Sequence, residues 1–194
     1  MGRIAAFLLM AAVPAGAGDL LVEVRDRRGA AVPDAVVYAV PEAKGPLPPP
    51  RRAVVDQKNR MFVPHVLAIQ TGTAVTFPNS DNVRHQVYSF SPAKRFQLPL
   101  YAGTPAAPVV FDKPGVVAIG CNIHDQMSAY LVVVDTPYFA RTTSGGAELA
   151  GLPDGRYDVR VWYEGMRNEP PPQSVRVGAG VADPGRLTFR IGEK

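Results

Sequence analysis

The chain has 194 residues and a formal net charge of +4, with 20 prolines, 18 glycines and one cysteine. This length allows one large domain or two small ones. The small charge, without a basic stripe interleaved with aromatic residues, argues against nucleic-acid binding, and a single cysteine excludes an internal disulfide and dithiol redox chemistry.

Residues 1–17 have the layout of a secretory signal peptide. Arg3 gives a basic start, Ile4 to Val13 form an apolar run, and Ala15-Gly16-Ala17 ends it with small residues. We therefore expect cleavage after Ala17 and a mature protein in a bacterial periplasm, with a retained membrane anchor as the alternative. The apolar run is too short to span a bilayer and no later stretch is long enough, so we expect no membrane span after cleavage.

Short segments rich in Val, Tyr and Phe, separated by Gly, Pro, Asn and Asp, predict strands along the chain. These segments are 20–25, 35–40, 73–77, 85–90, 115–121, 129–135, 157–163 and 187–191. No window has the extended apolar spacing of three and four that predicts a helix. The sequence therefore predicts an all-β protein with a β-sandwich architecture.

Two breaks in composition divide the chain. GPLPPPRR (45–52) is a stiff proline-rich linker, and DTPYFARTTSGG (135–146) is rich in turn residues. We predict a cysteine-containing domain at 53–136 and one second domain formed by 18–45 together with 137–194, because exposed loops tolerate inserted domains. A single larger sandwich with extra edge strands is the alternative.

The two outer segments resemble the two halves of a carboxypeptidase-regulatory-like, prealbumin-type sandwich. VEVRDRRGAAVPDAVVYAV (22–40) is similar to the first hairpin of that domain, and TTSGGAELAGLPDGRYDVRVWYEG (142–165) is similar to the rest of it. The resemblance implies that the central domain is inserted in, or fused to, a second small β-sandwich.

The central segment brings soft metal donors close together in the sequence. Alternation along GVVAIGC places Cys121 on the same strand face as Val117 and Ile119, and the loop CNIHDQM then adds His124 and Met127. A further imidazole, His85, stands at the start of an earlier predicted strand. Two His, one Cys and a weak axial Met are the ligand set of a blue-copper electron-transfer site.

Two stretches of this segment resemble the cupredoxin family. FVPHVLAIQTGTAVTFPNSDNVRH is similar to the cupredoxin opening, and VVFDKPGVVAIGCNIHDQMSAYLVVV to its ending, with a Cys-x-x-His-x-x-Met loop most similar to that of amicyanin. Residues 53–136 as a whole resemble bacterial periplasmic cupredoxins labelled methylamine-utilisation proteins. The resemblance implies a Greek-key sandwich and one type 1 copper per chain, with His85, Cys121 and His124 as equatorial ligands and Met127 as the axial one.

Two positions depart from the family's pattern. Gln86 stands where related proteins usually have an Asn that ties the ligand loops together. Three asparagines are candidates to replace it: Asn79, Asn82 and Asn122. Ile123 stands where Pro is frequent and, unlike Pro, keeps its backbone N–H, which would favour Cu(I) if it reached the Cys121 sulfur.

Simpler interpretations exist for several residues. Cys121 and Met127 taken singly are typical of core packing, but their spacing with His124 favours a ligand role. We interpret His65, the third histidine, as a core or edge residue rather than a ligand. A solvated face is the default for five basic residues, with a patch that docks an acidic partner as the alternative: Arg51, Arg52, Arg84, Lys94 and Arg95.

The predicted function is single-electron transport by a monomer with no catalytic residue. Three histidines cannot supply the additional copper centres of an oxidase or nitrite reductase, and a thioether disfavours zinc. A Cys121–His124 nucleophile pair is disfavoured because such pairs usually come from distant segments. The resemblance implies a c-type cytochrome or periplasmic dehydrogenase as redox partner. A periplasmic copper carrier or sensor with the same ligands, or a structural module with a vestigial site, is the alternative.

Overall fold

The regular structure of the described residues is all β-structure. The computed structural model describes residues 17–105, 107–178 and 185–192, and its seventeen regular elements within these ranges are all strands. The same ranges contain no helix long and apolar enough to cross a membrane. The predicted all-β class is therefore confirmed.

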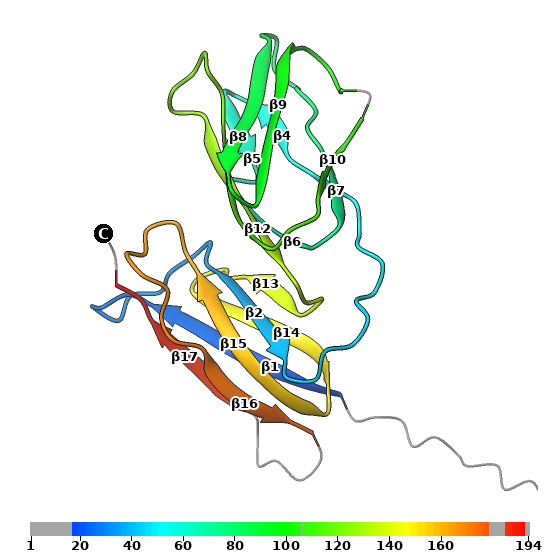
Figure 1. The fold of residues 1–194 in the computed structure, drawn as a ribbon. Helices are drawn as coiled ribbons and strands as arrows, with labels where there is room; N and C mark the ends of the chain where they lie inside the picture. The colour runs from blue at the N-terminus through cyan, green and yellow to red at the C-terminus, as the bar shows by residue number, and fades with distance from the viewer. Residues whose placement is uncertain (1–16, 106, 179–184, 193–194) are drawn as a thin grey trace, which may run out of the picture.

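The two outer segments together form a three-stranded sheet, β14-β1-β17, and a four-stranded sheet, β13-β2-β15-β16. The first contains β14 (Gly146–Pro153), β1 (Ala17–Arg25) and β17 (Arg186–Arg190). The second contains β13 (Phe139–Arg141), β2 (Val36–Pro41), β15 (Gly155–Trp162) and β16 (Gln173–Val177). β1 is antiparallel to β14 and parallel to β17, so the two ends of the described chain lie in one sheet (Figure 1).

The central segment forms a five-stranded sheet, β6-β12-β11-β8-β9, a three-stranded sheet, β10-β7-β3, and the small hairpin β4-β5. The five strands are β6 (Val66–Gln70), β12 (Ser128–Val134), β11 (Gly115–Gly120), β8 (His85–Ser91) and β9 (Lys94–Tyr101). The others are β10 (Val109–Phe111), β7 (Thr73–Thr76), β3 (Ala53–Val54), β4 (Asp56–Lys58) and β5 (Met61–Val63). Among the described residues, no strand of these sheets pairs with a strand of the outer ones.

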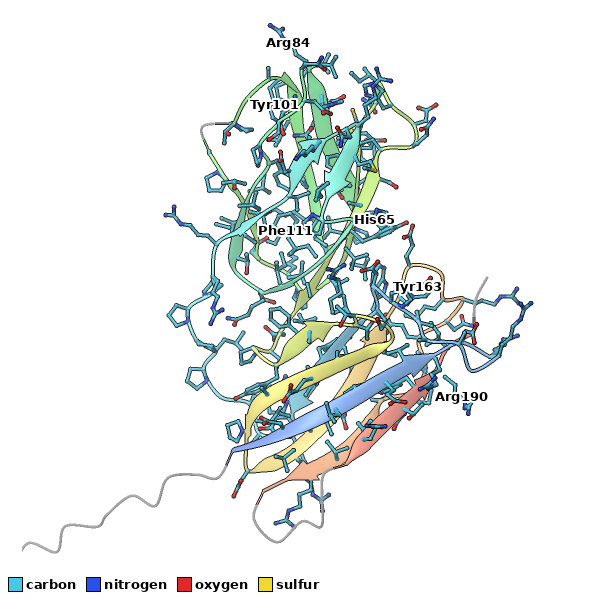
Figure 2. All side chains as sticks on the ribbon, turned by 180° about the vertical axis from the view of Figure 1, so that it is seen from behind. His65, Arg84, Tyr101, Phe111, Tyr163 and Arg190 are labelled. Carbon is cyan, nitrogen blue, oxygen red and sulfur yellow. The ribbon has the colours of Figure 1, made fainter. Side chains whose placement is uncertain are left out.

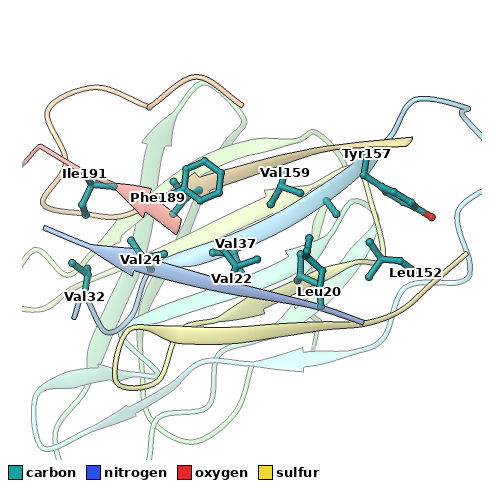
Figure 3. Close-up of a cluster of buried hydrophobic side chains, with 14 of the residues drawn as sticks. Leu20, Val22, Val24, Val32, Val37, Leu152, Tyr157, Val159, Phe189 and Ile191 are labelled. Atoms are coloured by element: carbon teal, nitrogen blue, oxygen red, sulfur yellow. The ribbon is translucent and has the colours of Figure 1, made fainter. Parts of the chain in front are cut away.

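Each pair of facing sheets encloses its own apolar core. Figure 3 shows the outer core, whose members include Leu20, Val22, Val24, Val37, Leu152, Tyr157, Val159, Phe189 and Ile191. The central core is a second cluster that includes Phe62, Phe77, Val87, Phe111, Val117 and Leu131. Because buried apolar area is the main stabilising contribution to folding, each sandwich has its own source of stability.

Strand β12 is buried on both of its faces. Leu131 belongs to the central core, whereas Val132 packs with Trp162 and Met166 in a third cluster where the two sandwiches meet. A strand covered on both faces has a continuous apolar sequence instead of an alternating one, which explains the run LVVV. We call this third cluster, which also contains Val36, Val66 and Val134, the junction core.

A polar contact borders the junction core. His65 Nδ1 lies 3.0 Å from the carbonyl oxygen of Ser128, and His65 Nε2 lies 2.6 Å from Glu164 Oε2, on the far side of the junction. Figure 2 shows His65 on the central sandwich, on the side facing Tyr163. His65 is thus an edge residue, and it lies outside the His–Cys–His cluster described below.

The predicted domain boundaries, 18–45 with 137–194 and 53–136, stay a prediction, although the strands fall into sheets on either side of them. The predicted signal peptide, 1–17, lies outside the described residues except for Ala17, which begins β1.

We predict that Met166→Ala weakens the junction. Removing a buried Met side chain should lower the free energy of unfolding by about 2 kcal/mol, because the deleted atoms leave a void against Val132 and Trp162. Trp162 is the only tryptophan, so urea unfolding followed by its fluorescence reports directly on this core. The control, Met61→Ala at an exposed position, should change stability by less than about 0.5 kcal/mol; equal midpoints for the two variants would contradict the prediction.

Candidate metal centre

His85 is the first residue of β8. It is buried together with Val87 and Ser89 of the same strand, and the imidazole is fully buried at 0% exposure. Nδ1 lies 4.0 Å from the sulfur of Cys121, and Nε2 lies 2.7 Å from Asp81 Oδ2. One ring nitrogen therefore faces the thiol and the other is held by a carboxylate.

Cys121 directly follows Gly120, the last residue of β11. Val117, Ile119 and Cys121 lie in the same core, as the alternation predicted, and the cysteine is 3% exposed. Its thiol is free. Gly120, directly before it, pairs with Ser128 of β12, so neighbouring strand residues hold both ends of the loop formed by residues 121–127.

His124 occupies the middle of this loop. Its carbonyl oxygen accepts a hydrogen bond of 2.9 Å from the N–H of Met127, which closes a turn. Its ring lies 5.0 Å from the ring of His85, and its Nδ1 is buried and has no hydrogen-bond partner among the described residues. A buried polar atom without a partner is costly, so this nitrogen is suited to binding a ligand.

Three donor atoms converge at this point. One ligand atom each from His85, Cys121 and His124 lies within 4.8 Å of the others. Met127 is 1% exposed, belongs to the same core as Cys121 and lines with it a cavity of about 540 Å³. Thiolate and thioether are soft donors and imidazole suits copper, so the residues present fit a copper ion.

Asp81 is a residue that the sequence analysis did not identify. Its carboxylate accepts the backbone N–H of Asn59 on Oδ1 at 2.6 Å and that of Arg60 on Oδ2 at 2.9 Å, besides contacting His85. Burial alone would raise the pKa of this carboxyl group, but hydrogen bonds from Arg60, His85 and Asn59 hold the pKa below its ordinary value. The only signal in the sequence is an acidic residue four positions before a candidate ligand.

Asn79 holds the loop before β8 in place through its side chain. Its buried Nδ2 donates to the carbonyl oxygens of Val83 and Tyr101 at 2.9 and 2.8 Å, and its Oδ1 accepts the Asp81 N–H at 3.0 Å. Of the three candidate asparagines it is the one with this network. It joins the loop before β8 to β9, whereas the expected partner was the other ligand loop.

Tyr101 secures the same end of β9. It pairs with His85 across the strands, its hydroxyl donates to the carbonyl oxygen of Phe77 at 2.7 Å, and Gln57 Nε2 donates to that hydroxyl. Burial raises the pKa of Tyr101 to about 12. The hydroxyl group therefore stays protonated at neutral pH and keeps its role as a donor.

The backbone of Ile123 does not have the role considered for it. Its side chain is 50% exposed. Within the described part of the chain, its N–H makes no hydrogen bond to the Cys121 sulfur, whose polar neighbour is the His85 ring. The expectation that this N–H favours Cu(I) is therefore not supported.

The basic residues lie in more than one part of the molecule. Figure 2 shows Arg84 at the end of the molecule far from the outer sandwich, directly before β8. Lys94 pairs with Ser91 at the opposite end of β8 and forms an ion pair with Asp112 at 2.9 Å. A separate cavity of about 590 Å³ is lined by Arg51 and Arg52 together with Phe139 of the outer sandwich. Arg84 and Lys94 therefore lie at opposite ends of β8, and a patch that docks an acidic partner stays a prediction.

No protein-family model matches the chain, and no curated protein matches it. Several solved structures resemble part of it. A purple cupredoxin from Nitrosopumilus maritimus is 25% identical, with a TM-score of 0.36 over 42% of this chain and 96% of that one. An oxidised amicyanin mutant is 18% identical, with a TM-score of 0.39 over 50% of this chain and 99% of that one. A copper-containing nitrite reductase from Thermus scotoductus SA-01 is 27% identical, with a TM-score of 0.40 over 50% of this chain and 25% of that one.

We predict that Asn79→Ala destabilises the site. The variant leaves the carbonyl oxygens of Val83 and Tyr101 without their donor, which should lower the free energy of unfolding by about 1–3 kcal/mol. The matched control is Asn82→Ala, three residues away at an exposed position, which should stay within about 0.5 kcal/mol of the parent. Urea denaturation measures both, and the prediction fails if the Asn79 variant is as stable as the control.

Proposed function

We propose that this chain is a periplasmic type 1 copper protein that carries single electrons between redox partners. The observation that carries the proposal is the convergence of the Cys121 thiol with the imidazoles of His85 and His124, their ligand atoms within 4.8 Å of one another. The buried Nδ1 of His124, without a hydrogen-bond partner among the described residues, supports it.

The proposed ligands are His85, Cys121, His124 and Met127, which together would hold one copper ion per chain. When bound, the copper would supply the chemistry of gaining and losing one electron. The chain's part is to hold the donor atoms in place, to exclude water from the thiolate and to expose one ligand to a partner. The burial of Cys121 and Met127 serves the exclusion of water.

The way the donors are held favours electron transport over copper carriage. The loop 121–127 is fixed at both ends by the pair Gly120–Ser128 and inside by the Met127 N–H to His124 carbonyl bond. His85 is fixed by β8 and by Asp81. Donor atoms held on rigid elements move little between two redox states, whereas a carrier must open its ligand set to release the ion.

His124 is the proposed point of electron entry and exit. Its Nδ1 is buried while the residue as a whole is only partly buried. Exposed apolar side chains are present in both ligand loops, Val83 before His85 and Ile123 before His124. These two side chains are the proposed contacts for a redox protein, for which a c-type cytochrome or a periplasmic dehydrogenase is the proposed class.

The outer sandwich, built from residues 18–45 and 137–194, is proposed as a scaffold or partner-docking domain, with no catalytic residue in the chain. Export through the signal peptide at 1–17 and a monomeric state complete the proposal. The copper ion would do the redox work, and the protein would set its geometry and potential.

The first test is the visible and electron paramagnetic resonance spectrum of the mature protein from Gly18 reconstituted with Cu(II). We expect an intense blue thiolate-to-copper band and narrow hyperfine splitting, both absent in Cys121→Ala because the thiolate is gone. The control is His65→Gln, which removes a histidine outside the cluster and should keep both features. An ordinary, pale Cu(II) spectrum of the parent protein would end the electron-transfer proposal.

A kinetic measurement separates electron transport from copper carriage. We expect rapid electron self-exchange and slow transfer of Cu(I) to a competing chelator, since the ligand loop is closed at both ends. Fast release of Cu(I) together with slow self-exchange would favour the carrier.

A further inference from the structure

We propose that Asp81 is a positioning residue for the metal centre: its carboxylate fixes the His85 ring in the tautomer that carries its proton on Nε2, which leaves the lone pair of Nδ1 facing the Cys121 sulfur. The tautomer follows from contacts within this chain. Its consequence for copper rests on the proposed function.

The proton assignment follows from counting donors. Asp81 Oδ1 accepts the N–H of Asn59, and Oδ2 accepts the N–H of Arg60. A backbone N–H can only donate, so both carboxylate oxygens already act as acceptors. At 2.7 Å from Oδ2, Nε2 must therefore be the donor. A neutral imidazole has one donor and one acceptor nitrogen, so Nδ1 carries the lone pair.

That lone pair is directed at the cluster. Nδ1 of His85 lies 4.0 Å from Sγ of Cys121. A carboxylate on the far nitrogen of a ligand histidine orients the ring and raises the basicity of the ligating nitrogen. More basic donation favours the more highly charged Cu(II) state over Cu(I).

The carboxylate is itself held in place before any ligand binds. Its side chain is 11% exposed, and its own N–H donates to Asn79 Oδ1 at 3.0 Å. The two residues that donate to it, Asn59 and Arg60, form the two-residue turn of the β4–β5 hairpin, with φ of 55° and 56°. Both values are typical of a type I′ turn, and Arg is not favoured in this left-handed region. Asp81 thus binds the turn and the histidine with one group.

The second histidine–carboxylate pair of the described residues, His65 with Glu164, differs from the pair His85 with Asp81. His65 contacts Glu164 through Nε2, but its Nδ1 faces a second acceptor, the carbonyl oxygen of Ser128. That pair is also largely exposed, at 47% and 40% for the two side chains. Both ring nitrogens of His65 face acceptors outside the candidate metal centre. Glu164→Gln is therefore a matched control.

The test begins with the metal-free protein. Long-range ¹⁵N–¹H correlation spectra of the histidine rings at neutral pH report the His85 tautomer in the parent, Asp81→Ala, Asp81→Asn and Glu164→Gln. We expect only the Nε2–H form in the parent and in Glu164→Gln, and a mixture of tautomers in Asp81→Ala. A parent with its proton on Nδ1, or an Asp81→Ala ring that stays entirely Nε2–H, would overturn the proposal. If Asp81→Ala does not fold, Asp81→Asn gives the test by a reduced preference for Nε2–H.

The second readout uses copper. Loss of such an outer partner typically weakens metal binding about 10–100-fold, and we expect this for Cu(II) in Asp81→Asn, with a smaller change for Cu(I). The reduction potential should then rise by about 59 mV for each tenfold difference between the two. Glu164→Gln should match the parent in both measurements. Unchanged affinity and potential in Asp81→Asn would overturn the positioning role.

The two proposals fail in different ways. A fixed tautomer that depends on Asp81, in a protein whose copper complex lacks the thiolate band, would leave the positioning intact and reject the proposed function. If the parent protein is blue but its His85 tautomer and reduction potential do not change in the Asp81 variants, the proposed function stands and the positioning role is rejected.

Discussion

The burial of β12 on both of its faces is the constraint on which the rest of the molecule depends. One face completes the central core through Leu131, and the other forms the junction core through Val132 and Trp162. The first residue of the same strand, Ser128, pairs with Gly120 next to the ligand loop. The strand that joins the two sandwiches therefore also fixes one end of the loop that holds three of the four candidate ligands.

Much of the fold could be predicted from local sequence. Strands β9 and β14 could not, because proline and glycine residues interrupt their patterns. Strands β8, β11, β12 and β15 carry the Val- and Tyr-rich runs that indicate strands. β9 did not stand out, because Pro99 and two basic residues interrupt its pattern. It is an edge strand, where one side has no partner and proline is tolerated. β14 contains Gly151 at a φ of 67°, which weakens the same signal.

Part of the candidate site could likewise be predicted from local sequence, and part of it could not. Cys121, His124 and Met127 lie on one short loop, so donor chemistry and spacing were sufficient to select them. The contributions of Asp81 and Asn79 depend on contacts that cross about twenty residues, to the β4–β5 turn and to β9. The only local signal was the acidic residue four positions before His85. The same limit explains Ile123, whose expected contact depended on the path of the loop backbone.

The position of β1 has a consequence for the order in which the molecule is completed. β1 is the first described strand, yet it lies in the middle of its sheet, between β14 and β17 from the last part of the chain. The central strands, from β3 to β12, find all of their partners among themselves. A chain that emerges from its N-terminus can therefore assemble the ligand-bearing sandwich while β1 still waits unpaired, because domains generally fold as units. The sheet that contains β1 is complete only when β17 has paired with it.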